Sequence, residues 1–202
     1  MKKGFTLIEL LVVIAIIIIL AAILLPYIIN RVEESRISRM TGEIRSLKTA
    51  MLLYYNDLNV FPNTWNDLVN NNPTNPRWKG PYIERITNST TAVWTEASPW
   101  KTNFRLIVQY STTAFNFAGQ ADYPFTKAVA LEIVNPEVPA GSGNNTIPPS
   151  SLVKIDTELD DGVHGTGLIV GGNANATSIG GITTAAYTAA NVSMYVLLQG
   201  LR

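Results

Sequence analysis

The residues most able to do chemistry form an acidic cluster in the C-terminal half of the chain. Asp156, Glu158, Asp160 and Asp161 lie close together, and Gly162 follows them. A turn with alternating acids can supply several of the oxygen ligands that a calcium ion takes, although this spacing is not that of an EF-hand. An Asp-Gly hairpin turn needs the same residues and no metal. The sequence therefore leaves two interpretations open, a calcium site and a turn alone.

The rest of the sequence offers little for catalysis. His164 is the only histidine, and the chain has no cysteine. His164 has no obvious nucleophile beside it, so a loop residue is the simpler interpretation. The sequence has no glycine-rich phosphate loop and no zinc-ligand spacing. Its formal net charge of +0 gives no reason to expect nucleic acid as a partner. We expect a protein that is not an enzyme, with calcium as the one cofactor left open.

A single acid, Glu9, lies inside a long apolar run at the N-terminus. The run extends from Phe5 to Ile29, and Lys2 and Lys3 come before it. As a helix the run would measure about 37 Å, enough to cross a hydrocarbon core of about 30 Å. The two lysines favour a cytoplasmic N-terminus. A carboxylate inside a membrane segment is costly and usually has a defined partner, so Glu9 needs one.

The segment Gly4-Phe5-Thr6-Leu7-Ile8-Glu9 resembles the type III signal peptide of type IV pilins and of the pseudopilins of type II secretion. In that family a prepilin peptidase cuts after the glycine and methylates the new N-terminal residue. The resemblance implies that residues 1–4 are a leader, that cleavage falls between Gly4 and Phe5, and that Phe5 is N-methylated. It also implies that Glu9 pairs with the Phe5 amine of a neighbouring subunit during assembly.

Simpler interpretations of the same segment exist. An ordinary secretory signal has an apolar core of about 7–15 residues and a small-residue cleavage site, whereas this run is longer and ends in Leu25-Pro26-Tyr27. A plain signal anchor would span the membrane without needing Glu9 or Gly4. An acid in the first helical turn also interacts favourably with the helix dipole, by about 0.3–1 kcal/mol, which is an alternative role for Glu9.

Beyond Asn30 the apolar residues recur mostly at intervals of three and four, which predicts an amphipathic helix over residues 30–58. Pro26 is expected to kink or loosen the helix before this part, and Gly42 weakens it by up to about 1 kcal/mol relative to alanine. Charged residues fill much of the remaining surface, as a solvated face or as pairs between subunits. The apolar stripe consists of Val32, Ile37, Met40, Ile44, Leu47, Met51, Tyr55 and Leu58.

Residues 59–202 are expected to form one globular domain outside the cytoplasm. Prolines interrupt residues 56–81, which predicts a loop with at most a short helix at 64–69. A turn-rich linker is expected at 135–151. Strands are predicted at residues 104–110, 127–134 and 192–198. The fold class is α+β: a long N-terminal helix, first apolar and then amphipathic, packed on a small antiparallel sheet, as in the pilin fold that the resemblance implies.

Two aromatic motifs favour one branch of the family. The segment Trp78-Lys79-Gly80-Pro81-Tyr82 is similar to the W-x-G-P-Y segment of major pseudopilins. The segment Ser98-Pro99-Trp100-Lys101-Thr102-Asn103-Phe104 looks like an altered D-P-W-G-N-x-Y segment of the same proteins. We expect Trp78 and Trp100 to anchor the core. Major pseudopilins also bind calcium in a C-terminal loop, which keeps the calcium interpretation open, although their ligands find no residue-by-residue match here.

The resemblance implies a mechanical function. The chain would wait in the inner membrane as a single-pass protein with a cytoplasmic N-terminus. After processing it would polymerise on an inner-membrane assembly platform, with minor pilins, into a helical filament in the periplasm or at the cell surface. The aromatic motifs favour the major pseudopilin of a type II secretion system. The major pilin of a type IV pilus, used for adhesion, motility or DNA uptake, is the alternative. A membrane-anchored binding module is a third interpretation, from a different class.

Overall fold

An apolar run that continues into an amphipathic one predicts a single long helix, and the computed structural model contains it. Helix α1 extends over Leu7–Leu58 and passes through Pro26 without interruption. The structure describes residues 6–70, 75–84, 86, 92–134, 147–187 and 192–202. The chain divides into two compact units, Met1–Arg36 and Ile37–Arg202, and α1 contributes residues to both.

In the first unit the apolar side chains of α1 are exposed. The large hydrophobic residues from Leu7 to Val32 have 47–81 % of their surface accessible. The most apolar window of the helix reaches a mean hydropathy of 3.4, so by length and composition this helix could cross a membrane. An apolar surface of this size needs lipid or other protein chains to cover it.

In the second unit the apolar stripe of α1 is buried. Residues three or four positions apart lie on one face of a helix. Two members of the expected stripe are placed differently. Val32 is exposed because it belongs to the first unit, and Tyr55 is half-buried because Tyr54 takes the inward position instead. The buried hydrophobic residues of α1 are Ile37, Met40, Ile44, Leu47, Ala50, Met51, Tyr54 and Leu58.

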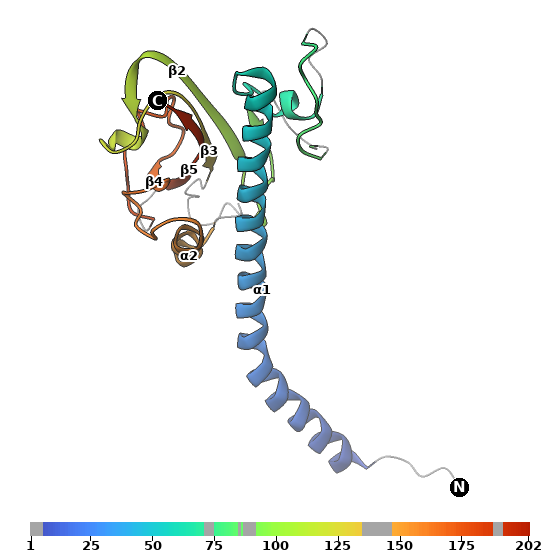
Figure 1. Ribbon diagram of the computed structural model, residues 1–202. Coiled ribbons are helices and arrows are strands. Elements are labelled where there is room, and N and C mark those ends of the chain that lie inside the picture. Colours follow the sequence, from blue (N-terminus) through green and yellow to red (C-terminus); the bar gives the residue numbers. More distant parts are fainter. Residues whose placement is uncertain (1–5, 71–74, 85, 87–91, 135–146, 188–191) are drawn as a thin grey trace. The chain divides into compact units, whose positions relative to one another are not determined.

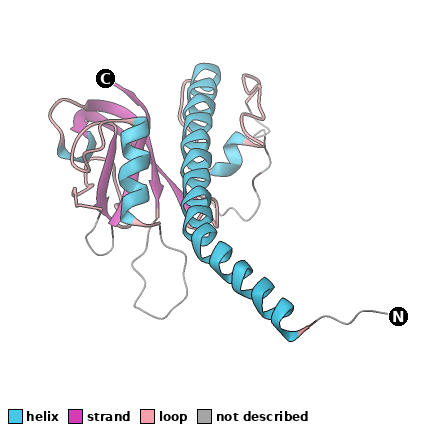
Figure 2. Cartoon of the chain, turned by 90° about the horizontal axis from the view of Figure 1, so that it is seen from below, coloured by secondary structure: helices cyan, strands magenta, loops and turns pink. Residues whose placement is uncertain are grey.

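The second unit contains one five-stranded antiparallel sheet with the strand order β1-β2-β3-β5-β4 (Figure 1, Figure 2). The strands are β1 (Val93–Trp94), β2 (Phe104–Asn116), β3 (Pro124–Ile133), β4 (Ile169–Asn173) and β5 (Val192–Leu201). The predicted strands correspond to β2, β3 and β5, and β2 continues past its predicted end through a register shift between Tyr110 and Phe115. The short strands β1 and β4 were not predicted. The predicted short helix is the 3₁₀ turn η1 (Trp65–Leu68).

The sheet is buried on both faces. Alternate residues of a strand point to opposite sides. One set, which includes Leu106 and Val196, packs with the buried stripe of α1. The other set, which includes Ile107 and Leu197, packs with buried residues of the segment 176–182. The second core explains how a C-terminal half rich in small residues is held in place.

A second helix replaces the end of the expected turn-rich linker. Helix α2 extends over Pro149–Leu159 and has Pro149 in its first turn, where the missing N–H of a proline costs no helical hydrogen bond. Leu152 and Ile155 of α2 join the core that α1 shares with the sheet. The linker prediction is therefore wrong at its C-terminal end, and its residues 135–146 lie outside the described residues.

A buried ion pair lies on the sheet face opposite α1. Arg105 and Glu132 are direct partners across β2 and β3, and Arg105 Nε and Nη2 both contact Glu132 Oε2. Glu132 is fully buried. Its Oε1 accepts hydrogen bonds from the Tyr195 hydroxyl at 2.9 Å and from the Asn175 N–H at 2.8 Å, while Arg105 Nη2 donates to the Ala176 carbonyl at 2.8 Å. The pair thus ties three strands to the loop that follows β4.

Candidate functional site

The N-terminal motif forms the start of α1. The N–H and the hydroxyl of Thr6 both donate to Glu9 Oε2, at 2.8 and 2.7 Å. In return the Glu9 N–H donates to the Thr6 hydroxyl oxygen at 3.3 Å. This reciprocal arrangement is a capping box, which satisfies N–H groups that have no partner inside a helix. Gly4 and Phe5, the predicted residues of cleavage and methylation, lie outside the described residues.

The capping box gives Glu9 a partner within its own chain. A threonine followed three residues later by a glutamate, before an apolar run, is the sequence signal for this box, and the sequence interpretation of Glu9 did not use it. Both side chains are exposed, and Glu9 Oε1 accepts no hydrogen bond within the described part of the chain. The Glu9 carboxylate can therefore keep its hydrogen bonds with Thr6 through Oε2 and still accept a hydrogen bond from another chain through Oε1.

The structure gathers three of the four predicted acids. Carboxylate oxygens of Asp156, Asp160 and Asp161 lie within 4.8 Å of one another. The structure does not place Glu158 with them: it is exposed, because two positions along a helix turn it about 200° away from Asp156. The candidate metal centre therefore consists of three carboxylates, one from α2 and two from the residues that follow it.

Two of these acids organise the loop that joins α2 to β4. Asp160 Oδ2 accepts hydrogen bonds from the N–H groups of Leu168 and Ile169, the second at 2.9 Å. Asp161 Oδ2 accepts a hydrogen bond from the Thr166 hydroxyl at 2.6 Å. The Asp-Gly turn thus connects a helix to a strand rather than two strands of a hairpin, and its carboxylates replace the backbone partners that the loop lacks.

Asp156 differs from the other two acids because it is fully buried. Its Oδ2 accepts a hydrogen bond from the Tyr187 hydroxyl at 2.7 Å, and its Oδ1 has no hydrogen-bond partner among the described residues. Burial raises the pKa of Asp156 to about 6, and the Tyr187 hydroxyl and the Gly162 N–H oppose this rise. Nearby, burial lowers the pKa of Lys48 on α1, and the charge of Asp160 opposes that change.

This donor set fits a calcium ion in part. Calcium takes six to eight oxygen ligands, and main-chain carbonyls and water commonly complete a set of carboxylates. Asp156, Asp160 and Asp161 would contribute carboxylate oxygens, and the unpartnered Asp156 Oδ1 is the atom that most lacks a positive neighbour. Tyr187, which the sequence analysis did not single out, would orient Asp156.

The motif from Trp78 to Tyr82 fastens a loop to the end of α1. The Tyr82 hydroxyl donates to Asp57 Oδ2 at 2.8 Å and accepts the Lys79 N–H at 3.1 Å. The rings of Trp78 and Tyr82 meet edge-on with centroids 5.7 Å apart. A Cβ on Gly80 would lie 2.5 Å from the Trp78 ring and 2.8 Å from the Tyr82 ring. The motif therefore needs a glycine because its two rings close over that position.

The second motif forms a tight turn before β2. Ser98 Oγ accepts hydrogen bonds from the N–H groups of Trp100 and Thr102, at 3.2 and 2.9 Å, as an aspartate side chain does in such turns. Lys101 has a φ of +59°, a left-handed conformation that glycine adopts most easily, and it stands where the motif it resembles has glycine. Trp100 is buried and Trp78 packs against the same core, which confirms both as core anchors.

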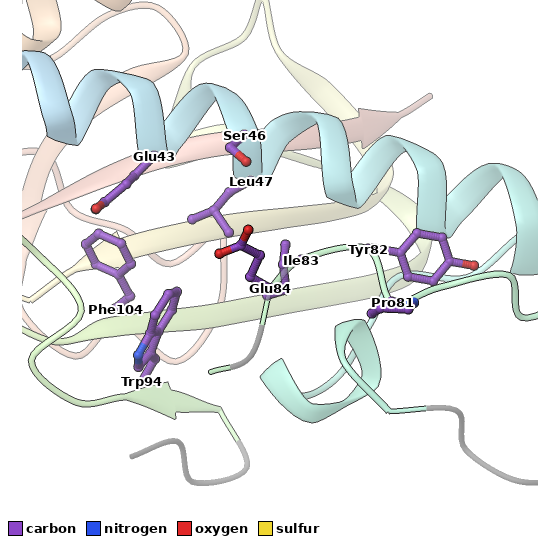
Figure 3. Close-up of a pocket in the computed structure, with 9 residues that line it drawn as sticks. All are labelled: Glu43, Ser46, Leu47, Pro81, Tyr82, Ile83, Glu84, Trp94 and Phe104. Atoms are coloured by element: carbon purple, nitrogen blue, oxygen red, sulfur yellow. The ribbon is translucent and has the colours of Figure 1, made fainter. Parts of the chain in front are cut away.

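A cavity of about 650 Å³ lies between α1, the end of the first motif and the sheet (Figure 3). Glu43 Oε1 accepts a hydrogen bond from Arg39 Nε at 2.8 Å, whereas Glu43 Oε2 is buried without a partner in the described residues. Glu43 is one of the charged residues of the amphipathic half of α1 and was not among the predicted site residues. The walls include Glu43 and Leu47 of α1, Tyr82 and Glu84 of the loop, Trp94 of β1 and Phe104 of β2.

Comparison with known proteins identifies the N-terminal part of the chain. Residues 1–25 match the family model of the prokaryotic N-terminal methylation motif, and residues 27–117 match that of type II secretion system protein G. The chain is 30% identical over 92 residues to the type II secretion system core protein G of Pseudomonas aeruginosa. This aligned stretch is 42% of the present chain and 65% of the Pseudomonas protein.

Pilins match over shorter stretches. The chain is 54% identical over 50 residues to the type IV major alpha-pilin of Moraxella bovis, covering 25% of this chain and 31% of the pilin. It is 49% identical over 61 residues to the fimbrial protein EcpC of Eikenella corrodens, covering 30% and 40% of the two chains. The chain thus spans less than two thirds of the length of each of these relatives.

The two family matches include the N-terminal motif, α1, both aromatic motifs and β2. Strands β3, β4 and β5, helix α2 and the acidic cluster lie beyond them. Through its first 117 residues the chain is therefore similar to proteins that carry a prokaryotic N-terminal methylation motif followed by a type II secretion protein G domain.

Proposed function

We propose that the chain is the major pseudopilin of a type II secretion system, a structural subunit that polymerises into a helical filament. The observation that carries this proposal is the division of α1. Its capped, apolar half is exposed, and its amphipathic half, which lies within the protein G match, is buried against the sheet. A helix with one half packed on its own domain and the other half bare is suited to insert that bare half among identical copies.

Before assembly the apolar half lies in the inner membrane, with the N-terminus in the cytoplasm. During assembly the apolar segments of neighbouring subunits cover one another and replace lipid with protein. Glu9 pairs with the Phe5 amine of the next subunit, and this pair gains strength where water is sparse. The assembly platform, minor pilins and prepilin peptidase are the other partners of this process.

Processing by the prepilin peptidase is the first step that can be tested. Cleavage between Gly4 and Phe5 and methylation of Phe5 predict a mature chain that lacks residues 1–4 and carries one added methyl group. Gly4→Val should leave the unprocessed chain in the membrane, because a branched side chain obstructs the close approach of the backbone. Mass spectrometry of assembled filaments decides the matter, and an intact Met1 in them would contradict this step.

The major pilin of a type IV pilus is the second candidate. The identity of 54% to a type IV pilin over 50 residues favours it, although this match covers only 25% of the chain. Deletion of the gene in its host separates the two. Loss of secreted proteins from the medium while surface pili remain supports the pseudopilin. Loss of surface pili while secretion continues supports the pilin. A membrane-anchored binding module predicts that the purified chain forms no filaments at all.

We also propose that Asp156, Asp160 and Asp161 hold a calcium ion that stabilises the loop between α2 and β4. The support is the buried, unpartnered Asp156 Oδ1 beside two further carboxylates. The ion would have a structural role, since Asp160 and Asp161 already hold this loop through hydrogen bonds.

A further inference from the structure

The cavity beside α1 combines two carboxylates with three aromatic rings. Figure 3 shows Glu43 and Leu47 reaching from α1, Trp94 and Phe104 on the side of the sheet, and Glu84 between them. Its volume of about 650 Å³ exceeds that of a few water molecules. It is therefore large enough for the end of a side chain or a small organic molecule.

Among the described residues, the two carboxylates at this cavity have one cationic partner between them, Arg39. Arg39 pairs with one oxygen of Glu43, but the Arg39 side chain is 68% exposed. The second oxygen of Glu43 is buried and unpartnered, and Glu84 forms no ion pair with the described residues. Burial raises the pKa of Glu43, and Arg39 opposes this rise. A buried carboxylate oxygen without a donor is costly, so Glu43 would gain a partner by turning this oxygen toward a cation in the cavity.

The aromatic and apolar wall residues indicate which kind of cation the cavity would bind. Trp94 and Phe104 meet edge-on with centroids 6.0 Å apart, and Tyr82 and Leu47 add further apolar surface. Aromatic faces attract cations, and a guanidinium group both stacks on such rings and donates through a planar fork to carboxylates. An ammonium group is more strongly hydrated and gains less from this setting.

We propose that this cavity binds a guanidinium group carried on a short apolar stem, with Glu43 and Glu84 as its acceptors. The site is distinct from the N-terminal assembly residues and from the acidic cluster. Two sources share this chemistry, a free small molecule and an arginine side chain of a neighbouring subunit. The second source rests on the proposed filament, whereas the binding chemistry of the cavity does not.

The experiment titrates the full-length chain, in nonionic detergent micelles, with n-butylguanidinium and with its neutral near-isostere n-butylurea, followed by ligand-observed NMR. We expect n-butylguanidinium to bind at least about tenfold more tightly, because a hydrogen bond to a charged group contributes more than one to a neutral group. Glu43→Gln should weaken its binding by about tenfold and Glu84→Gln by a few-fold. Glu34→Gln, which changes an exposed acid of α1 that is not among the wall residues, should leave binding unchanged.

Equal binding of the two probes, or unchanged binding in Glu43→Gln, would overturn the proposal. If circular dichroism shows that Glu43→Gln is unfolded, Glu84→Gln on the exposed loop decides in the same way. The same titration on sheared filaments then separates the two sources. If n-butylguanidinium binds in micelles but not in filaments, an arginine of a neighbouring subunit occupies the cavity. If it binds in both, the natural ligand is a free molecule. Failure to obtain filaments would contradict the proposed function and leave the micelle titration intact.

Discussion

Thr6 and Glu9 hold each other at the start of α1, with the Thr6 N–H and hydroxyl 2.8 and 2.7 Å from Glu9 Oε2. A glutamate at this position can therefore serve two purposes, as half of a capping box and as a charged partner for a neighbouring subunit. The first purpose needs an acceptor at the end of the side chain, which glutamine also supplies. The second needs the negative charge. The two roles of Glu9 can accordingly be separated by substitution.

The rings around Gly80 give a prediction about stability. Gly80→Ala places a Cβ 2.5 Å from the Trp78 ring, so the rings must separate, and we expect a loss of about 1–3 kcal/mol in the free energy of unfolding. Gly42→Ala is the matched control. Its new Cβ meets no atom within 4 Å, and it should stabilise α1 by up to about 1 kcal/mol. Urea denaturation measures both, and a Gly80→Ala chain as stable as wild type would refute this account of the motif.

The buried ion pair gives a second prediction. Arg105→Met leaves the buried Glu132 charge without its partner and should cost about 3–5 kcal/mol of unfolding free energy. Adding Glu132→Gln removes that charge while keeping an acceptor for Tyr195 and Asn175. The double variant should therefore be more stable than Arg105→Met alone. A double-mutant cycle tests this, and a double variant less stable than the single one would contradict it.

Asp156 predicts how stability depends on pH. Its pKa of about 6 in the folded chain lies above the ordinary value of 3.8, so the folded state binds its proton more readily than the unfolded state. The contribution of Asp156 to stability should therefore increase as the pH falls from about 7 to about 4. In calcium-free buffer Asp156→Asn should show a flatter pH dependence than wild type, whereas Asp122→Asn, an exposed acid, should not. Parallel curves for wild type and Asp156→Asn would contradict the prediction.

Calcium should raise the melting temperature if the acidic cluster binds it. A ligand that binds only the folded state stabilises it by about 2.7 kcal/mol at a hundred times its dissociation constant. Asp161→Asn should lose this effect, and Glu158→Gln should keep it because Glu158 is not gathered with the other acids. Differential scanning calorimetry with calcium and with a chelator measures the shift. Equal melting temperatures in the two buffers would contradict calcium binding, and the three acids would then only stabilise the loop through hydrogen bonds.

Local patterns were enough to predict α1 and three of the strands, because their periodicity lies within short stretches of sequence. Strand β4 was missed because its two glycines resemble a loop. A Cβ on Gly172 would lie 2.7 Å from the Ile182 side chain, so this glycine lets the covering segment 176–182 approach the sheet. Helix α2 was missed because Pro148 and Pro149 suggest a turn, although a proline also suits the first turn of a helix.

Contacts between distant residues could not be predicted in the same way. The burial of Glu132 depends on the strand register that places Arg105 opposite it. The hydrogen bond from Tyr187 to Asp156 joins residues that are 31 positions apart. The cavity beside α1 needs four separate segments to form its walls, namely α1, the loop 81–84, β1 and β2. Each of these features follows from how the elements pack, and no single stretch of the sequence contains it.

Filament yield from Glu9→Gln subunits tests the central claim, that the charge of Glu9 drives assembly. Glutamine keeps an acceptor for Thr6, so this variant should insert into the membrane, be cleaved after Gly4 and retain the start of α1. Thr6→Val is the matched control, because it removes the capping hydroxyl and leaves the charge. With processing confirmed by mass spectrometry, filaments are counted in sheared fractions of cells that express each subunit alone. We expect few or no filaments from Glu9→Gln, as from Glu9→Leu, and clearly more from Thr6→Val; a wild-type yield from Glu9→Gln would contradict the account and leave Glu9 as a capping residue only.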